Sequence, residues 1–274
     1  MACHTRSNSF PSRSHPIIQE VDEHLCRLRS SESTTTSSST ISHKLSGLQD
    51  LHDCVDRLLQ LPLNQQALAQ EKHQKCANEL LDGSLRLLDV CSTAKDALLQ
   101  TKECMQNLQS IIRRRRGEES EVLSSEIKKY LTSRKMVKKV IHKAIGNLKG
   151  VKNSSLNNDQ ETIAIVSKLR DIEAVSFTIF ESVLSFISGP KSKPSSWSLV
   201  SKMVQSKRVA CDEEAKVNEF AEVDAALKSL KSADNAQNQL SNLESCIQDQ
   251  EEGLESLFRQ LIKTRVSLLN ILNH

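Results

Sequence analysis

The chain of 274 residues is poor in the residues that build turns and sheets. It contains only 7 Gly and 5 Pro, and aromatic residues make up 3% of it. Alternating strand patterns joined by Asn-Gly or Asp-Gly turns are missing, and the one such dipeptide, Asp82-Gly83, lies between leucines at helical spacing. These absences argue against a β-sandwich or barrel, so the sequence predicts an all-α fold.

Motifs that carry chemistry are missing too. The eight histidines do not pair with carboxylates or cysteines at ligand spacing, and the chain has no HExxH, no GxSxG and no phosphate-binding loop. His52, Asp53 and Cys54 are consecutive, but neighbours along a helix point in different directions and cannot act together. We therefore expect no catalytic residue, no cofactor and no metal site, structural zinc included.

Neither the cysteines nor the apolar segments indicate export or a membrane span. The eight cysteines are widely scattered without a CxxC pair, and no apolar signal core follows Met1. These features favour a cytoplasmic protein with reduced thiols over a secreted one, and a nuclear or membrane-peripheral location is the alternative. The most apolar stretch, Ala174–Ile187, contains Glu181 and is shorter than the ~20 residues of a span, so we interpret it as a core helix.

A long apolar ladder occupies the end of the chain. From Leu240 to Ile271 apolar residues recur every three or four positions, and only Gln250 and Thr264 interrupt them. Such a stripe follows one side of a helix about ten turns long and must be covered by other helices. The ladder predicts a helix interface whose central residues are Leu254, Leu257, Leu261 and Leu268.

The order of patterns predicts a short N-terminal region followed by one large domain. Residues 1–40 hold a disordered arm, a short helix from Pro16 to Arg29 and a Ser/Thr linker, and residues 41–274 hold an elongated bundle of long antiparallel helices. We expect Gly83 to be the one candidate break in the second of the bundle's helices, a turn over residues 146–158 and a loop over residues 188–196. The expected helices run from Ser42 to Pro62, Asn64 to Arg116, Glu118 to Leu148, Asp159 to Ile187, Trp197 to Val209, Glu213 to Ser232 and Asn235 to the end.

The middle of the chain is a basic island. Arg113–Lys152 holds 13 Lys/Arg and 4 Asp/Glu, a net charge of +9, whereas the rest of the chain carries −6. The island could bind anionic lipid or an acidic partner, or it could be a solvated face balanced by acidic helices. Nucleic acid is the weakest candidate because Tyr130 is the only aromatic residue there. The arginine run could also act in nuclear import or as favourable charge at a helix end. The residues of this basic face are Arg113, Arg114, Arg115, Arg116, Lys128, Lys135, Lys139 and Lys143.

The N-terminal arm contains a short motif, Arg6-Ser7-Asn8-Ser9-Phe10-Pro11. Arg6 precedes Ser9 by three residues, as basophilic kinases require, and with Pro11 the pattern resembles phosphopeptides that 14-3-3 proteins bind through clustered arginines. Phosphorylated Ser9 is therefore a candidate docking site for a 14-3-3 protein. Chance occurrence in a polar tail and an organelle transit peptide are the alternatives.

Three segments together resemble a plant-specific family related to the Bypass protein. They are the arm Arg6–Pro16, the segment Trp197–Val200 and the closing run Leu254–Asn270. The resemblance covers nearly the whole chain and implies a protein of root and shoot development, with no catalytic residues to carry over.

Three functions stay open at this point. The leading hypothesis is a non-enzymatic interaction and regulatory protein that binds protein partners through helix faces. A peripheral membrane protein that binds anionic lipid through the basic helix is the alternative. An unrecognised enzyme would need several titratable groups converging in a cavity.

Overall fold

The structure, a computed structural model, describes residues 15–31, 37–70, 73–114, 120–154, 164–190, 218–229 and 233–273. Within these ranges the chain forms helices and no strand, as the sequence predicted. The helices are α1 (Pro16–Ser30), α2 (Ser38–Leu59), α3 (Pro62–Leu68), α4 (Gln74–Arg114), α5 (Ser120–Ser154), α6 (Ala164–Ser188), α7 (Glu219–Ser229) and α8 (Ala233–Leu272).

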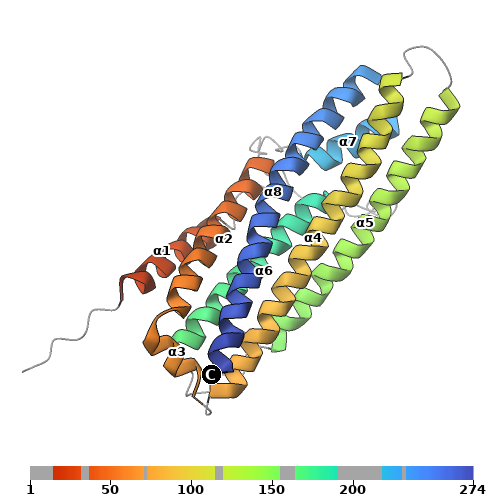
Figure 1. The fold of residues 1–274 in the computed structure, drawn as a ribbon. Coiled ribbons are helices and arrows are strands. Elements are labelled where there is room, and N and C mark those ends of the chain that lie inside the picture. The colour runs from red at the N-terminus through yellow and green to blue at the C-terminus, as the bar shows by residue number, and fades with distance from the viewer. Residues whose placement is uncertain are drawn as a thin grey trace, which may run out of the picture.

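The helices form an elongated bundle built around α4 and α8 (Figure 1). The α8 helix packs along α4 on one side and α2 on the other, while α5 packs along α4 and α6. The α1 helix lies against α2 and α6, and the short α7 crosses α8. This arrangement leaves α5 at one flank of the bundle, with only part of its circumference covered.

Local sequence explains where several helices begin and end. The α2 helix starts where the Ser37 side chain accepts a hydrogen bond from the backbone N–H of Thr40. Pro16 and Pro62 occupy the first turns of α1 and α3, where a missing N–H costs nothing. The α6 helix ends at Ser188, and Gly189 follows it with a φ of 74°, in the left-handed region that favours glycine.

The expected break near Gly83 is wrong. The α4 helix runs without interruption from Gln74 to Arg114, and the discontinuity falls earlier, after α3. Gly83 is buried against α6, and a Cβ there would lie 2.4 Å from the Glu173 carboxyl group. The glycine therefore serves a close approach of two helices and not a turn.

Two further expectations need correction. Residues 146–154 are the last turns of α5 and not a turn, because neither Gly146 nor Gly150 interrupts the helix. Leu85, expected on the inner face of its helix, is 46% exposed, and Leu80 and Leu87 fill the core on that side. The helix expected over residues 197–209 lies outside the described residues.

The apolar core runs the full length of the bundle. The positions expected inward on α5 and α6 are confirmed, since Ile127, Tyr130, Val137, Ile141, Leu148, Ile165, Leu169, Ile172, Ile179, Val183 and Ile187 are all buried. Among the helices that the structure describes, none is both long enough and apolar enough to cross a membrane.

Candidate functional site

The outer side of α5 brings together the four lysines that the sequence placed on one helix side. Lys128, Lys135, Lys139 and Lys143 are all exposed, whereas Ile127 and Tyr130 face the core. At 100° per residue, the four lysines lie within about 80° of one another around the helix. The prediction that they share one side is therefore consistent with the structure.

None of these four lysines forms an ion pair with a residue that the structure describes. In the part of the chain that the structure describes, no carboxylate lies within 4.0 Å of any of the four ammonium groups. Two other lysines of α5 differ, because Lys129 pairs with Glu126 at 2.6 Å and Lys138 pairs with Asp224 at 2.7 Å. The described lysines of α5 thus fall into two groups, a paired one and an unpaired one.

Two exposed apolar side chains adjoin the lysines. Met136 is 57% exposed and Val140 is 54% exposed, and each follows one of the lysines directly in the chain. On a helix they lie next to the lysine side and away from the core. We call Lys128, Lys135, Met136, Lys139, Val140 and Lys143 the α5 outer face. It combines cationic and apolar groups. The sequence analysis identified the lysines but not the two apolar residues, although each of these directly follows a lysine in the chain.

The inner side of α5 is held by a buried ion pair. Arg134, which is 2% exposed, donates from Nε to Asp224 of α7 at 3.3 Å and from Nη2 to the Ile187 carbonyl oxygen at 2.8 Å. Its guanidinium also lies 4.9 Å from the centre of the Phe220 ring. Burial raises the pKa of the neighbouring Tyr130 hydroxyl well above its usual range. This cluster joins α5 to α6 and α7 and fixes the orientation of the α5 outer face.

The sequence reasoning did not single out Arg134. Its position was available, because Arg134 continues the inward series Tyr130, Val137 and Ile141 at helical spacing. A charged residue within a buried stripe needs a partner, and that requirement could have predicted an ion pair.

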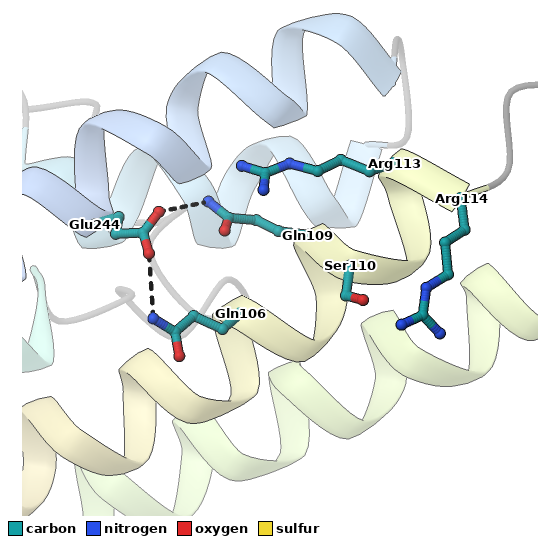
Figure 2. Close-up of a pocket in the computed structure, with 6 residues that line it drawn as sticks. All are labelled: Gln106, Gln109, Ser110, Arg113, Arg114 and Glu244. Carbon is teal, nitrogen blue, oxygen red and sulfur yellow. Dashed lines mark hydrogen bonds between the residues drawn. The ribbon is translucent and has the colours of Figure 1, made fainter.

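The arginine run at the end of α4 borders a shallow pocket of about 430 Å³ (Figure 2). Arg113 and Arg114 are exposed and point to different sides of the helix. Glu244 of α8 lies in the pocket, where it accepts hydrogen bonds from Gln106 and Gln109 at 3.2 Å each. The diverging guanidinium groups and the carboxylate make this pocket a poor site for one anion. Arg115 and Arg116 lie outside the described residues.

The predicted helix interface of α8 faces the inside of the bundle. Leu254, Leu257, Leu261 and Leu268 are at most 5% exposed. The two polar residues that interrupt this ladder are buried as well.

The α8 helix binds a buried carboxylate of α2 with polar groups. The hydroxyl of Thr264 donates to Asp56 at 2.9 Å, and the ammonium group of Lys263 pairs with Asp56 at 3.0 Å. The stripe therefore specifies how α8 docks on α2 and α4, and its leucines are not available to a separate partner.

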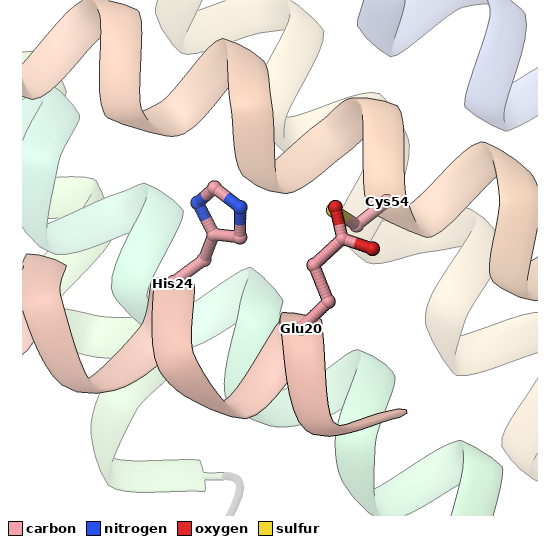
Figure 3. A group of neighbouring side chains, drawn as sticks. All are labelled: Glu20, His24 and Cys54. Carbon is pink, nitrogen blue, oxygen red and sulfur yellow. The ribbon is translucent and has the colours of Figure 1, made fainter. Parts of the chain in front are cut away.

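Among the described residues, one group of possible metal ligands appears, whereas the sequence predicted no metal site. Glu20 and His24 of α1 and Cys54 of α2 place ligand atoms within 4.8 Å of one another (Figure 3). A cation already occupies this place, because Nη2 of Arg57 lies 2.6 Å from Glu20 Oε1 and 3.0 Å from Cys54 Sγ. Burial also raises the pKa of the Cys54 thiol, which disfavours the thiolate that a metal requires. The group fits an interhelical contact better than a metal centre.

The consecutive residues His52, Asp53 and Cys54 diverge, as expected for neighbours on a helix. His52 and Cys54 are buried and Asp53 is exposed. Burial lowers the pKa of His52 to about 4, and its Nε2 lies 3.1 Å from the Ser176 hydroxyl. His52 is thus a neutral core residue. Arg6, Ser9 and Pro11 of the N-terminal motif lie outside the described residues.

Comparison with known proteins identifies a family. No curated protein and no solved structure matches the chain. The model of a family described as "Protein BPS1" matches residues 44–271, a range that includes α3 to α7, most of α2 and all of α8 except its last residue. No enzyme family is indicated, and this match suggests a plant developmental protein. The chain therefore belongs to the Bypass-related family, as its end segments indicated.

Proposed function

We propose that this protein is a non-enzymatic helical module of plant development that attaches to anionic membrane surfaces through the α5 outer face. The observation that carries the proposal is a set of four exposed lysines, without an ion-pair partner among the described residues, beside two exposed apolar side chains on one helix. Membership of the Bypass-related family supports the developmental setting.

The dimensions and charge of the α5 outer face suit a lipid surface. From Lys128 to Lys143 the face extends for about 22 Å, at 1.5 Å per residue. Each lysine near an anionic leaflet contributes about 1 kcal/mol, so four give about 4 kcal/mol, and Met136 and Val140 add apolar contact. Such energies predict reversible binding that weakens with salt.

The composition of the α5 outer face favours lipid over a tightly bound protein partner. Protein interfaces concentrate their binding energy in Trp, Tyr and Arg seated in pockets, and this face has none of these residues. Lysines behave as flexible point charges, which match a fluid array of headgroups without a shaped counterpart. An acidic protein partner is the competing occupant, and the experiment below separates the two.

Co-sedimentation with phosphatidylcholine vesicles, with and without phosphatidylserine, tests the proposal. We expect binding that needs phosphatidylserine and falls with added salt, and a Lys135→Glu/Lys139→Glu variant that binds at least about tenfold more weakly. The matched control is Lys75→Glu/Lys228→Glu, which makes the same change of net charge at exposed lysines outside the α5 outer face.

Two results would overturn the proposal. One is no binding of the wild-type protein to either vesicle, in which case an acidic protein becomes the preferred occupant. The other is an equal loss in both variants, which would assign any binding to net charge. Docking of a 14-3-3 protein at phosphorylated Ser9 is a separate proposal. A Ser9→Ala variant that still binds the 14-3-3 protein would contradict it.

A further inference from the structure

The exposed side of α4 carries an acidic ladder that the sequence reasoning did not single out. Asp82, Asp89, Asp96 and Glu103 follow one another every seven residues and are all exposed. Seven residues fall about 20° short of two full helical turns, so the four carboxylates form a nearly straight line about 32 Å long. We call these four residues the acidic ladder.

The carboxylates of the acidic ladder have no ion-pair partner among the residues that the structure describes. Across the described ranges no lysine, arginine or histidine nitrogen lies within 4.0 Å of any of them. Two exposed leucines accompany the ladder, Leu85 at 46% and Leu99 at 51% exposure. Unpaired carboxylates beside exposed leucines make a surface complementary to the α5 outer face, which combines lysines with Met136 and Val140.

The two surfaces lie on neighbouring helices but do not satisfy each other within one chain. The α4 and α5 helices pack side by side and run in opposite directions (Figure 1). Both surfaces point away from the core, so neither is aimed at the other helix.

Their heights along the bundle match. Measured back from the ends of α4 and α5 at their connection, Asp96 lies level with about residue 138 and Glu103 with about residue 131 at equal rise per residue. Asp96 is thus level with Lys139, and Glu103 falls between Lys128 and Lys135.

We propose that two copies of this chain associate through these surfaces, with the acidic ladder of each copy against the α5 outer face of the other. A two-fold axis parallel to the helices sets α4 opposite the partner's α5 and preserves height, so the acidic and basic positions meet twice. The occupant is a second copy because the charges and heights that match are both present in this chain.

The size of the contact predicts a weak dimer. Two adjacent helices about 10 Å apart and about 32 Å long offer about 600 Å² per copy, near the lower limit for a specific interface. Exposed ion pairs add little each, so the association should need low salt. Dimer formation would cover the lysines proposed to bind lipid, but the inference does not rest on lipid binding.

Sedimentation velocity without lipid tests the dimer. We expect the sedimentation coefficient to rise with protein concentration at low salt and to stay at the monomer value at high salt. Asp89→Lys/Asp96→Lys and Lys135→Glu/Lys139→Glu should each be monomeric alone, and an equimolar mixture of the two should form a heterodimer, because the reversed charges match again. Asp50→Lys/Asp249→Lys changes exposed acids outside the ladder and should associate like the wild type.

The mixing experiment also verifies that the variants are folded, because only folded variants can complement each other. A wild-type protein that stays monomeric at low salt up to millimolar concentration would overturn the proposal. A mixture that sediments as its separate components, with both variants folded by circular dichroism, would overturn it as well. A protein that does not bind vesicles can still dimerise, and a protein that does not dimerise can still bind vesicles. The two experiments therefore test the two proposals separately.

Discussion

Helices α8 and α5 both carry a periodic stripe, and the bundle covers one stripe and leaves the other open. The α8 stripe is apolar, and its central leucines are at most 5% exposed. The α5 outer face consists of lysines and two apolar side chains that are more than half exposed. The same helical spacing therefore serves folding in one helix and a free surface in the other.

The covered and the exposed helix sides differ most clearly in whether their polar groups have partners within the protein. Thr264 in the covered stripe of α8 donates to Asp56, and Arg134 on the covered side of α5 pairs with Asp224. The four lysines of the α5 outer face have no such partner among the described residues. A buried polar group needs a partner in the protein, whereas the exposed lysines are solvated and stay accessible.

The largest expected effect is a charge placed in the covered stripe. Leu257→Asp buries a carboxylate without a partner at a fully buried site, and we expect it to cost more than about 4 kcal/mol and to abolish the cooperative unfolding transition. Ile262→Asp, on the same helix at 43% exposure, should leave the fold intact. Circular dichroism with thermal unfolding checks both variants, and a native-like transition in Leu257→Asp would contradict the covered stripe.

The next effect separates the two sides of α5. Arg134→Met leaves the carboxylate of Asp224 with Lys138 alone and removes the bond to the Ile187 carbonyl oxygen, so we expect a loss of about 3 kcal/mol. Lys135→Met is the matched change one residue away on the exposed side, and it should stay within about 0.5 kcal/mol. Urea unfolding measures both, and equal losses would contradict the assignment of covered and open sides.

The buried His52 predicts a pH dependence. Its pKa of about 4 in the folded protein lies below the ordinary 6.5, so the unfolded chain binds the proton first as the pH falls. Its contribution to stability is therefore present above about pH 6.5 and is lost toward pH 4, by about 2 kcal/mol between pH 7 and pH 5.

A His52→Leu variant should be less sensitive to acid than the wild type by that amount. Urea unfolding at the two pH values measures the difference, and a matched His43→Leu change at an exposed histidine is the control. A difference between wild type and His52→Leu that does not vary with pH would contradict a buried neutral His52.

The smallest effect compares two helical glycines. Gly146→Ala meets no atom within 4 Å and should stabilise the protein by about 0.5–1 kcal/mol. Gly83→Ala should show no such gain, because its Cβ displaces the Glu173 carboxylate from Arg86. In a Glu173→Ala background the gain at position 83 should return, and unfolding free energies of the four variants test this. The same gain at both glycines in the native background would contradict the close approach.

The sequence predicted the all-α bundle and most of its core because helical periodicity is a local property. The inward residues of α5 and α6 and the α8 ladder were identified correctly. The break predicted at Gly83 and the turn predicted from Gly146 were wrong. Gly146 is helical, and Gly83 allows a close contact with Glu173. At Gly83 the reason for the glycine is the helix packed against it, and one sequence does not show which helices pack together.

The candidate site was predicted only in part. The shared side of the four lysines followed from spacing, but their lack of acidic partners did not, because Lys138 looks the same in sequence and is paired. Exposure of Leu85 and Met136 depends on which helices cover α4 and α5. The acidic ladder could have been predicted from its seven-residue spacing. Its complementarity to the α5 outer face could not, because it depends on how α4 and α5 pack.

Tryptophan emission at position 136 tests the central claim most directly. Met136→Trp in a Trp197→Phe background places the single tryptophan on the α5 outer face, and Leu63→Trp in the same background places it on α3 at a site that is 79% exposed. On addition of vesicles containing phosphatidylserine, the account predicts a blue shift for position 136, reversed by salt, and none for position 63. A shift at position 63 alone, or at neither position, would contradict it.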